Sequence, residues 1–290
     1  MSAVLLEKAP AKINLTLQVL GRRADGYHEL ESLVAFAALC DRLTLQPGEN
    51  DSLEIAGPFA GKSGLVADNL VLKALAAARE RIAGLKAGLF ALEKVIPVAA
   101  GLGGGSADAA AALRLIARLN GIPVEDPRLM SAALAVGADV PVCIDARPRV
   151  MRGVGEVLSG PLDLPPLPAV LVNPGVALAT RDVFTQLAIK PAKRPSDNVP
   201  RGFDALINYL SRNGNDLTPA ACGCAPVVAE VLDLLQRLPG AKLARMSGSG
   251  ATCFALFGAA GEAAAAAQRL KAKKSWWVQE TMLGPVQTTS

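Results

Sequence analysis

Pro97-Val-Ala-Ala-Gly-Leu-Gly-Gly-Gly-Ser-Ala-Asp108 places four glycines within five positions, and an alanine-rich run from Ala107 to Leu119 follows at once. Glycine loses more backbone freedom on folding than any other residue, so this crowding is expected where the backbone itself must approach a ligand closely. A loop that opens into the first turn of a helix offers unpaired N–H groups and the positive end of the helix dipole. The segment therefore predicts a phosphate-binding loop followed by a helix, with an ordinary surface turn as the alternative.

Two common glycine motifs do not fit this sequence. The dinucleotide fingerprint requires a third glycine, but the spacing from Gly101 and Gly103 leads to Ser106 instead. The Walker A loop requires four residues between its first glycine and Gly-Lys-Ser, whereas the segment from Gly57 to Ser63 offers three. Residues 57–64 are therefore expected to form an ordinary loop.

The composition is that of an ordinary folded protein. Hydrophobic residues make up 51% and charged residues 19% of the 290 residues, which excludes a disordered chain and allows one large domain or two modest ones. The formal net charge of +4 is mild and suits an anionic small molecule. Because Lys and Arg are scattered rather than clustered, the sequence predicts no nucleic-acid partner.

The cysteines and the N-terminal segment indicate the cellular compartment of the protein. The five cysteines are an odd set without zinc-ligand spacing, and His28 is the only histidine, so we expect free thiols in a reducing compartment. Residues 1–30 contain several charges and no apolar signal core. No stretch reaches the roughly 18 apolar residues of a membrane span. A cytoplasmic protein with no membrane partner is therefore predicted.

Alternating apolar and polar residues mark the expected strands of the first half. They cover residues 3–7, 13–20, 32–39 and 41–46. Asp68-Asn69 is a typical cap for a helix that continues to about residue 83. Early strands followed by helices favour an α+β architecture over regular βαβ alternation.

A proline-rich segment at residues 159–168 marks the expected domain boundary. We predict an N-terminal domain over residues 1–160 and a C-terminal domain over residues 161–290. In the second domain, two strands are expected to flank Ser247-Gly-Ser-Gly250. A last strand is expected from Trp276, and the sequence leaves open whether this strand returns to the first domain.

Four more short segments, each containing glycine, proline or charged residues, are spread along the chain. They are Ala9-Pro-Ala-Lys-Ile-Asn14, Asp25-Gly-Tyr-His28, Gly137-Ala-Asp-Val-Pro141 and Ser247-Gly-Ser-Gly-Ala-Thr252. Together with the glycine loop, and in this order along the chain, they resemble the motifs of the GHMP kinases. The resemblance implies an α+β, two-domain fold with a ribosomal S5 domain 2-like N-terminal domain and a ferredoxin-like C-terminal domain. The active site is then expected in the cleft between the two domains.

Within this family the chain is most similar to members that phosphorylate a cytidine diphosphate-linked substrate. The resemblance implies ATP-dependent phosphorylation of the 2-hydroxyl of cytidine diphosphate-linked methylerythritol, in isoprenoid precursor biosynthesis by the non-mevalonate pathway. ATP and Mg²⁺ are the implied cofactors, and a monomer or weak homodimer is expected. Two alternatives stay open: another small-molecule kinase of the family, acting on mevalonate or homoserine, and a non-catalytic nucleotide-binding protein on the same fold.

Lys12 and Asp139 match the catalytic pair of the family. Transfer of a γ-phosphoryl group needs charge neutralisation and an in-line hydroxyl more than it needs covalent chemistry. Asp139 lies between Gly-Ala and Val-Pro, so we expect it at a constrained segment end, where it accepts the hydroxyl proton; a helix or turn cap is the alternative. Lys12 is expected to polarise the hydroxyl or stabilise the transferring group, with an exposed strand-edge lysine as the alternative.

The resemblance also assigns the ATP-binding residues, which form one continuous run. They are Pro97, Val98, Ala99, Ala100, Gly101, Leu102, Gly103, Gly104, Gly105, Ser106 and Ala107. No metal ligand is assigned from the protein, apart from Ser106 as a candidate contact to Mg²⁺.

The residues assigned to the substrate come from both halves of the chain. They are Asn14, Tyr27, His28, Phe184, Ser247 and Gly248. Tyr27-His28 and Phe184 are expected to hold the cytosine between them, because stacking on a base contributes about 1–3 kcal/mol and suits recognition remote from the reacting hydroxyl. An ordinary loop histidine and an ordinary hairpin turn at residues 247–250 are the alternatives.

Overall fold

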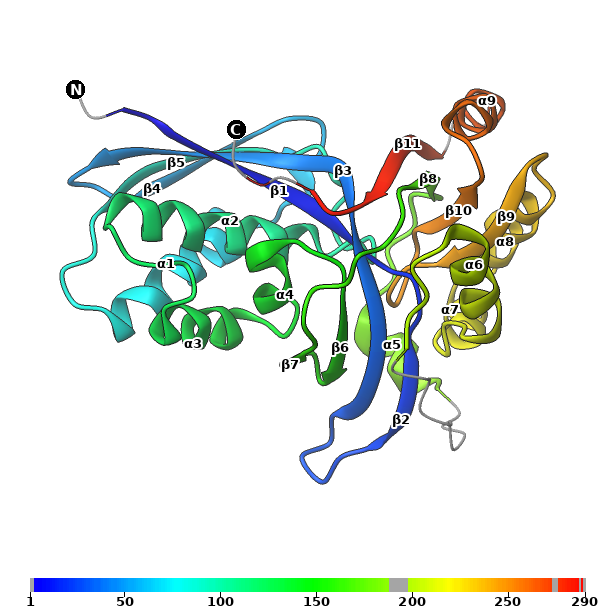
Figure 1. Cartoon of the computed structure of the whole chain (residues 1–290). Coiled ribbons are helices and arrows are strands. Elements are labelled where there is room, and N and C mark those ends of the chain that lie inside the picture. Colours follow the sequence, from blue (N-terminus) through cyan, green and yellow to red (C-terminus); the bar gives the residue numbers. More distant parts are fainter. Residues whose placement is uncertain (1–2, 188–197, 273–275, 287, 289–290) are drawn as a thin grey trace.

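The computed structural model of the chain describes residues 3–187, 198–272, 276–286 and 288. Its architecture is α+β, as predicted, and the described residues form one mixed sheet of eleven strands. Figure 1 shows that this sheet runs through the whole molecule, with helices α1–α4 in one lobe and α6–α9 in the other.

The described strands are β1 (Leu5–Asn14), β2 (Gln18–Arg22), β3 (His28–Gly48), β4 (Ser52–Ala56), β5 (Ala87–Glu93), β6 (Arg149–Gly153), β7 (Val157–Leu158), β8 (Leu167–Asn173), β9 (Ala241–Met246), β10 (Cys253–Phe257) and β11 (Trp277–Gly284). The described helices are α1 (Leu70–Arg81), α2 (Gly104–Leu119), α3 (Pro127–Val136), α4 (Val140–Asp145), α5 (Thr180–Thr185), α6 (Phe203–Arg212), α7 (Thr218–Cys224), α8 (Val227–Gln236) and α9 (Ala260–Leu270). Two short 3-10 turns, η1 (Ala60–Lys62) and η2 (Val66–Asp68), precede α1.

The 21-residue strand β3 connects most of the sheet. It pairs with β2 and β6 near its start, with β11 in its middle, with β1 from Val34 to Leu45, and with β5 toward its end. Our division of this segment into strands 32–39 and 41–46 is therefore wrong. The buried carboxylate of Asp41 does not interrupt β3, because it accepts hydrogen bonds from the Lys94 ammonium and from two backbone amides.

The first lobe packs its helices against one face of the sheet. Every residue of α2 from Ala107 to Ala117 is buried, and the small alanine side chains let this helix approach β1 and β3 closely. The predicted strands 3–7 and 13–20 are corrected to an unbroken β1 and a separate, later β2. Pro10, which cannot donate a backbone hydrogen bond, lies at an irregularity in the pairing of β1 with β3, so it does not end the strand.

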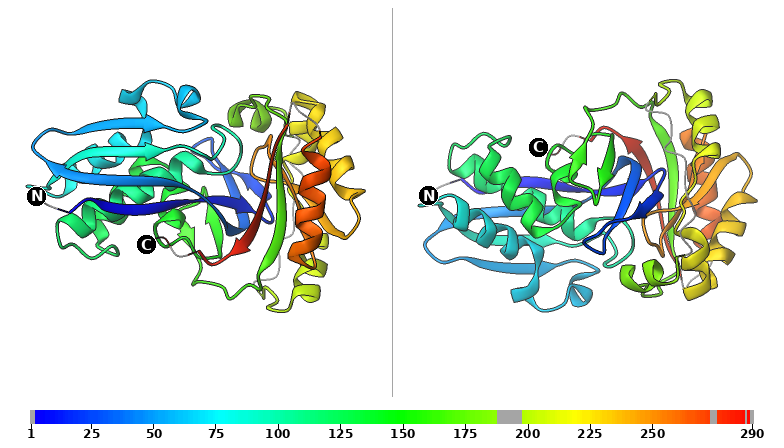
Figure 2. Two further views of the ribbon diagram at one scale, coloured as in Figure 1. Left: turned by 90° about the horizontal axis from the view of Figure 1, so that it is seen from above. Right: turned by 90° about the horizontal axis from the view of Figure 1, so that it is seen from below.

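In the second lobe, β8 is buried on both faces. Val170 and Val172 belong to the core beneath α8 and α9, whereas Ala169 and Leu171 belong to the core shared with β1 and α6. Figure 2 shows α8 and α9, coloured gold and orange, on the outer side of this part of the sheet. This double burial explains why β8 reads as a continuous apolar run rather than an alternating one.

The last strand joins the two lobes. β11 pairs with β8 from Trp277 to Leu283, and it then pairs with β3 through Leu283 and Gly284. The end of the chain thus returns to the first lobe, which the sequence had left open. Among the helices described, none is both long enough and apolar enough to cross a bilayer.

Arg114 of α2 connects three elements of the first lobe from a buried position. Its guanidinium donates to the Glu7 carboxylate at 2.9 Å, to the Cys143 carbonyl at 2.9 Å and to the Lys8 carbonyl at 2.6 Å. β1 and α4, which carry the residues on either side of the predicted active site, are therefore both bound to the same side chain of α2.

Replacement of Arg114 by Met should lower the free energy of unfolding by about 3–5 kcal/mol, because it removes the buried partner of the Glu7 carboxylate, which keeps only the more exposed Arg118, and leaves buried carbonyl groups unpaired. Chemical denaturation measures this change. Arg128→Met is the matched control, since Arg128 pairs with Asp126 on the exposed surface and should contribute less than about 1 kcal/mol. Equal losses in the two variants would contradict this interpretation of Arg114.

Candidate active site

A cavity of about 1580 Å³ gathers most of the predicted site residues from both lobes. Its walls come from the glycine loop, β1, the β2–β3 hairpin, α5 and the turn between β9 and β10. The predicted residues that line it are Lys12, Asn14, Tyr27, His28, Pro97, Val98, Ala99, Ala100, Gly101, Gly103, Gly104, Gly105, Ser106, Asp139, Phe184 and Gly248. Leu102, Ala107 and Ser247 are fully buried and are not part of this lining.

The backbone of the glycine loop has a conformation that suits glycine. Gly101 and Gly103 have φ angles of +74° and +60°, and a Cβ atom at Gly101 would lie 2.4 Å from the Ser247 carbonyl oxygen. α2 begins at Gly104, earlier than the predicted start at Ala107, so the last two glycines belong to its first turn. Because no side chain caps this end of α2, its first N–H groups remain available to an anion.

Two buried lysines lie directly against consecutive glycines at the start of α2. A Cβ atom at Gly103 would lie 3.2 Å from the Cβ and Cε atoms of Lys12, and one at Gly104 would lie 3.0 Å from Nζ of Lys94. Side chains at these two positions would push the lysines away. The glycines therefore bring two ammonium-bearing side chains next to the positive end of the helix dipole.

Lys12 and Asp139 form an ion pair inside the cavity. Nζ of Lys12 lies 2.9 Å from Oδ2 of Asp139 and donates to Oδ1 of Asn14 at 3.0 Å. The lysine side chain is 5% exposed and the aspartate side chain 37% exposed, so the ammonium is buried while the carboxylate is open to the cavity. This arrangement can orient a hydroxyl group, accept its proton and stabilise negative charge beside it.

Asp139 occupies the N-cap position of α4, which was the alternative to its catalytic role. Its side chain makes no capping hydrogen bond and instead pairs with Lys12. The sequence analysis did not predict α4, because a six-residue helix that contains a proline has no clear hydrophobic period.

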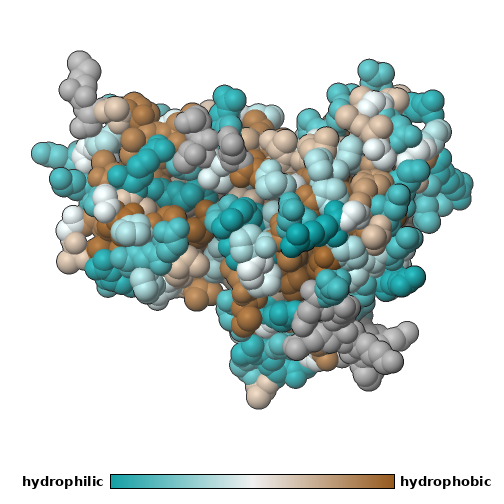
Figure 3. Space-filling model, viewed as in Figure 1, coloured by the Kyte–Doolittle hydropathy of each residue, from teal (hydrophilic) through white to brown (hydrophobic). Residues whose placement is uncertain are grey.

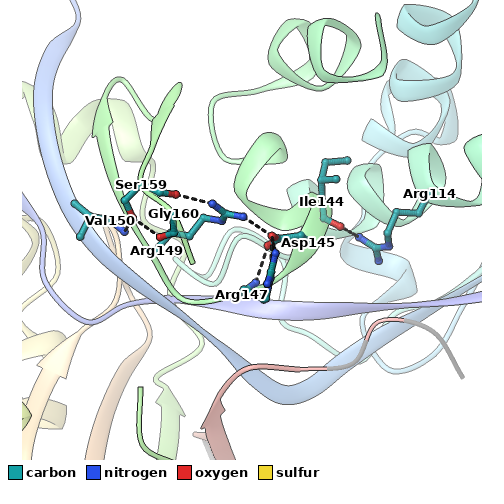
Figure 4. A network of polar contacts seen from close by, with 8 residues as sticks. All are labelled: Arg114, Ile144, Asp145, Arg147, Arg149, Val150, Ser159 and Gly160. Atoms are coloured by element: carbon teal, nitrogen blue, oxygen red, sulfur yellow. Dashed lines mark hydrogen bonds and ion pairs between the residues drawn. The ribbon is translucent and has the colours of Figure 1, made fainter. Parts of the chain in front are cut away.

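The far end of α4 is held by the network drawn in Figure 4. Arg114 donates to the Ile144 carbonyl at 3.2 Å, and the carboxylate of Asp145 accepts hydrogen bonds from Arg147 and Arg149. Arg149 also donates to the Ser159 carbonyl at 2.5 Å, which connects α4 to the β6–β7 hairpin. This network fixes the short helix and therefore the position of Asp139 at its start.

Ser247-Gly-Ser-Gly250 is both the turn of the β9–β10 hairpin and part of the cavity wall. The Ser247 hydroxyl accepts a hydrogen bond from the backbone N–H of Asn14 at 3.1 Å and donates one to the Gly101 carbonyl at 2.8 Å. The side-chain amide of Asn215 donates to the carbonyl groups of Met246, at the end of β9, and of Gly248, each at 2.8 Å. The turn is thus fixed to β1, to the glycine loop and to the loop before α7.

His28 and Phe184 stack on each other at one end of the cavity, with ring centroids 4.8 Å apart and planes at 28°. Figure 1 shows the β2–β3 hairpin projecting from the body of the molecule, and His28 is the first residue of β3 in this hairpin. The surface of this projection is largely hydrophilic in Figure 3, and Tyr27 near its tip is 65% exposed. Burial and then the charge of Arg22 lower the pKa of His28, which favours a neutral imidazole at pH 7.

Lys94, Asp41 and Asp108 form a buried cluster that the sequence analysis missed. Nζ of Lys94 lies 2.5 Å from Asp41 and 2.6 Å from Asp108. Burial raises the pKa of Asp108 from 3.8 to about 8, although the charge of Lys94 opposes this effect. Only the position of Asp108 directly after the glycine loop could have indicated this cluster, since Asp41 and Lys94 come from distant strands.

The described residues contain no group of three or more His, Cys, Asp or Glu side chains suited to a metal ion. The hydroxyl of Ser106 lines the cavity in the first turn of α2 and makes no hydrogen bond to the part of the chain that the structure describes. All five cysteines are free thiols, as expected.

Comparisons with known families find two matches in this chain. The model of the GHMP kinases N terminal domain matches residues 69–147, and the model of the GHMP kinases C terminal matches residues 196–275.

Individual proteins similar to this chain extend over nearly its whole length. The 4-diphosphocytidyl-2-C-methyl-D-erythritol kinase of Rhodopseudomonas palustris (strain BisB18) is 53% identical, covering 97% of this chain and 95% of that protein. The protein of the same name from Xanthobacter autotrophicus is also 53% identical, covering 95% of this chain and 98% of that protein.

Solved structures are similar in fold. A crystal structure of 4-(cytidine 5'-diphospho)-2C-methyl-D-erythritol kinase matches with a TM-score of 0.76 and 37% identity, covering 97% of this chain and 99% of that chain. Homoserine kinase from Cytophaga hutchinsonii shares the fold, with a TM-score of 0.71 and 20% identity over 98% of this chain and 96% of that chain.

Replacement of Asp108 by Asn should change the pH dependence of stability. Because the pKa of Asp108 is about 8 in the folded protein and 3.8 without burial, the folded state binds the extra proton and loses stability as pH rises between these values. Asn cannot titrate, so the melting temperature of the variant should rise relative to that of the original protein between pH 5.5 and about pH 8.5. A difference in melting temperature that does not vary with pH would contradict the raised pKa.

Proposed function

Since the chain belongs to the GHMP kinases, we propose that it transfers the γ-phosphoryl group of ATP to the 2-hydroxyl of 4-diphosphocytidyl-2-C-methyl-D-erythritol. The products are ADP and the 2-phosphate, in isoprenoid precursor synthesis by the non-mevalonate pathway. Relatives that carry this substrate in their name are more than half identical to the chain. The observation that supports the proposal best is that one cavity contains the glycine loop, the Lys12–Asp139 pair and the His28–Phe184 stack.

In this proposal the polyphosphate of ATP binds at the start of α2. The uncapped N–H groups of the first turn donate to phosphate oxygens, and the helix dipole favours their negative charge. The ammonium-bearing side chains of Lys12 and Lys94 lie against the same glycines, with their charge balanced by carboxylate partners. The adenosine is expected beside η2 and the start of α1, because Asp68, Asn69 and Leu70 line the same side of the cavity as Lys94.

Lys12 and Asp139 act on the acceptor hydroxyl. The Asp139 carboxylate accepts a hydrogen bond from the hydroxyl, aligns its oxygen for attack on the γ-phosphorus, and takes the proton. The Lys12 ammonium, 2.9 Å from that carboxylate, stabilises the charge on the oxygens of the phosphoryl group in transit. Asn14 fixes the ammonium by accepting one of its hydrogen bonds and is itself placed by Ser32.

The cytosine of the substrate binds at the opposite end of the cavity. A neutral His28 ring offers one donor and one acceptor nitrogen, and it can separate from Phe184 to make a sandwich with the base. Tyr27 is next to His28 and exposed beside the cavity, where it can contact the edge of the base. Ser247 acts indirectly by fixing the turn that presents Gly248 to the substrate.

Mg²⁺ is proposed as the partner of ATP. Its usual mode of binding uses phosphate oxygens, water and one or two protein oxygens, so a dense carboxylate cluster is not required. The free hydroxyl of Ser106 fits this limited demand. When bound, the ion neutralises charge on the phosphates.

The remaining parts of the proposal concern the assembly of the site. Residues 1–160 and 161–290 are proposed as the two domains that enclose the cleft, with β11 returning to the first. All the proposed site residues come from one chain, which supports activity as a monomer or weak homodimer. The cytoplasm is the proposed location, since it supplies ATP and keeps free thiols reduced.

A panel of acceptors tests this function. ADP release with Mg²⁺–ATP should be fast with the cytidyl substrate and near background with mevalonate or homoserine, because only the first fills the base site.

Asp139→Asn should lower the turnover number at least about 100-fold and leave ATP affinity nearly unchanged. Asp204→Asn, on the exposed side of α6, is the control. Near-normal turnover in Asp139→Asn would contradict the role of this carboxylate.

Replacement of His28 by Ala should weaken recognition of the base. Loss of a stacking partner is worth about 1–3 kcal/mol, so the KM for the cytidyl substrate should rise by about 5- to 150-fold. The KM for ATP should change little, because ATP binds at the other end of the cavity. Steady-state kinetics with each substrate varied in turn measures both values. A parallel rise in both KM values would show a general structural effect instead.

A further inference from the structure

The carboxylates that line the cavity all have partners, whereas two of the basic side chains do not have one among the described residues. Each lining carboxylate has a basic partner, in the pairs Asp68–Lys73, Asp108–Lys94, Asp139–Lys12 and Glu156–Arg23. Two other basic residues of the lining, Arg22 and Arg181, form no ion pair or side-chain hydrogen bond with any described residue. Two guanidinium groups of the cavity lining therefore have no counter-charge among the residues that the structure describes.

Each unpaired arginine is the neighbour of one ring of the His28–Phe184 stack. Arg22 lies directly opposite His28 in the pairing of β2 with β3, so their side chains share one face of the hairpin. Arg181 lies three residues before Phe184 in α5, so these side chains share one face of the helix. The influence of Arg22 on the pKa of His28, second to burial, agrees with this proximity.

α5 extends from the stacked rings toward the reaction end of the cavity. At its start, the Thr180 hydroxyl lies 2.8 Å from the Ser249 hydroxyl, in the turn that contacts the glycine loop. Near its end, Phe184 stacks on His28. Arg181 lies between these two contacts along the helix, and therefore between the proposed base site and the proposed phosphoryl-transfer site.

We propose that Arg22 and Arg181 bind the diphosphate bridge of the substrate, from opposite walls of the cavity. This inference rests on the proposed function, in which the bridge connects the cytidine to the reacting alcohol. Each phosphate of the bridge carries one negative charge, which balances the two uncompensated guanidinium groups. The planar guanidinium presents paired N–H donors that match phosphate oxygens, and such charge-assisted hydrogen bonds are stronger than neutral ones.

Binding of cytidine 5′-diphosphate and of cytidine, measured by calorimetry, tests the proposal without turnover. The ATP site is first filled with a saturating non-hydrolysable ATP analogue, so that the cytidine ligands report on the acceptor site alone. The original protein should bind cytidine 5′-diphosphate more tightly than cytidine.

Arg22→Gln and Arg181→Gln should each weaken binding of the diphosphate by about tenfold, and the double variant should weaken it further. Cytidine affinity should stay nearly constant, because the base site is intact.

Arg212→Gln is the matched control. Arg212 is an exposed arginine at the end of α6, outside the cavity lining, and its replacement removes the same charge. Its affinity for cytidine 5′-diphosphate should equal that of the original protein. Three results would each overturn the proposal. The first is that Arg212→Gln weakens binding of cytidine 5′-diphosphate as much as the cavity variants do. The others are that the cavity variants weaken binding of cytidine and of its diphosphate equally, or that the original protein shows no preference for the diphosphate.

Kinetics of the same variants separates this proposal from the function on which it rests. In Arg22→Gln and Arg181→Gln, the KM for the cytidyl substrate should rise while kcat stays close to its original value, because the bridge is remote from the reacting hydroxyl. Absence of turnover with the cytidyl substrate in the original protein would refute the proposed function itself. A selective loss of kcat in the arginine variants would refute only the assignment to the diphosphate.

Discussion

The two lobes of this protein meet where one backbone turn packs against another. The Gly101 carbonyl accepts a hydrogen bond from the Ser247 hydroxyl, and the same hydroxyl accepts one from the backbone N–H of Asn14. A Cβ atom at Gly101 would lie 2.4 Å from the Ser247 carbonyl oxygen, so this contact exists only because the residue is glycine. The glycine loop, β1 and the β9–β10 turn are placed together at this point, and the cavity between the lobes takes its shape from them.

The electrostatics of the site depend on the same close packing. Lys12 and Lys94 lie against Gly103 and Gly104, with their ammonium groups almost removed from water. A buried ammonium requires partners, and Asp139 provides one for Lys12, whereas Lys94 has two carboxylates. The two ammonium groups thus lie at the start of α2 with their charge balanced by buried or cavity-lining carboxylates.

Two elements connect the ends of the cavity. β3 begins at His28, in the stack, and reaches Ser32, whose hydroxyl accepts from Asn14 beside Lys12. α5 connects the turn that contacts the glycine loop to Phe184 in the same stack. Because both elements are regular secondary structure, the separation between the stacked rings and the Lys12–Asp139 pair is set by rigid backbone. A ligand that reaches both ends must match that length, which is a physical basis for selecting a long substrate.

Much of this organisation follows from local sequence, and the remainder does not. The glycine crowding before α2, the Asn69 cap of α1 and the order of the short motifs are properties of neighbouring residues, so the helix after the glycine loop and the α+β class were predicted correctly. The continuity of β3 depends on Lys94, a distant residue that satisfies the buried Asp41. The helix after Asp139 likewise depends on Arg114 and Arg149. The family resemblance implied that Lys12 and Asp139 belong together, but their 2.9 Å contact and the cluster around Lys94 arise only when the chain is folded. The same is true of the lack of partners for Arg22 and Arg181 among the described residues, because charge pairing depends on distance in space rather than along the sequence.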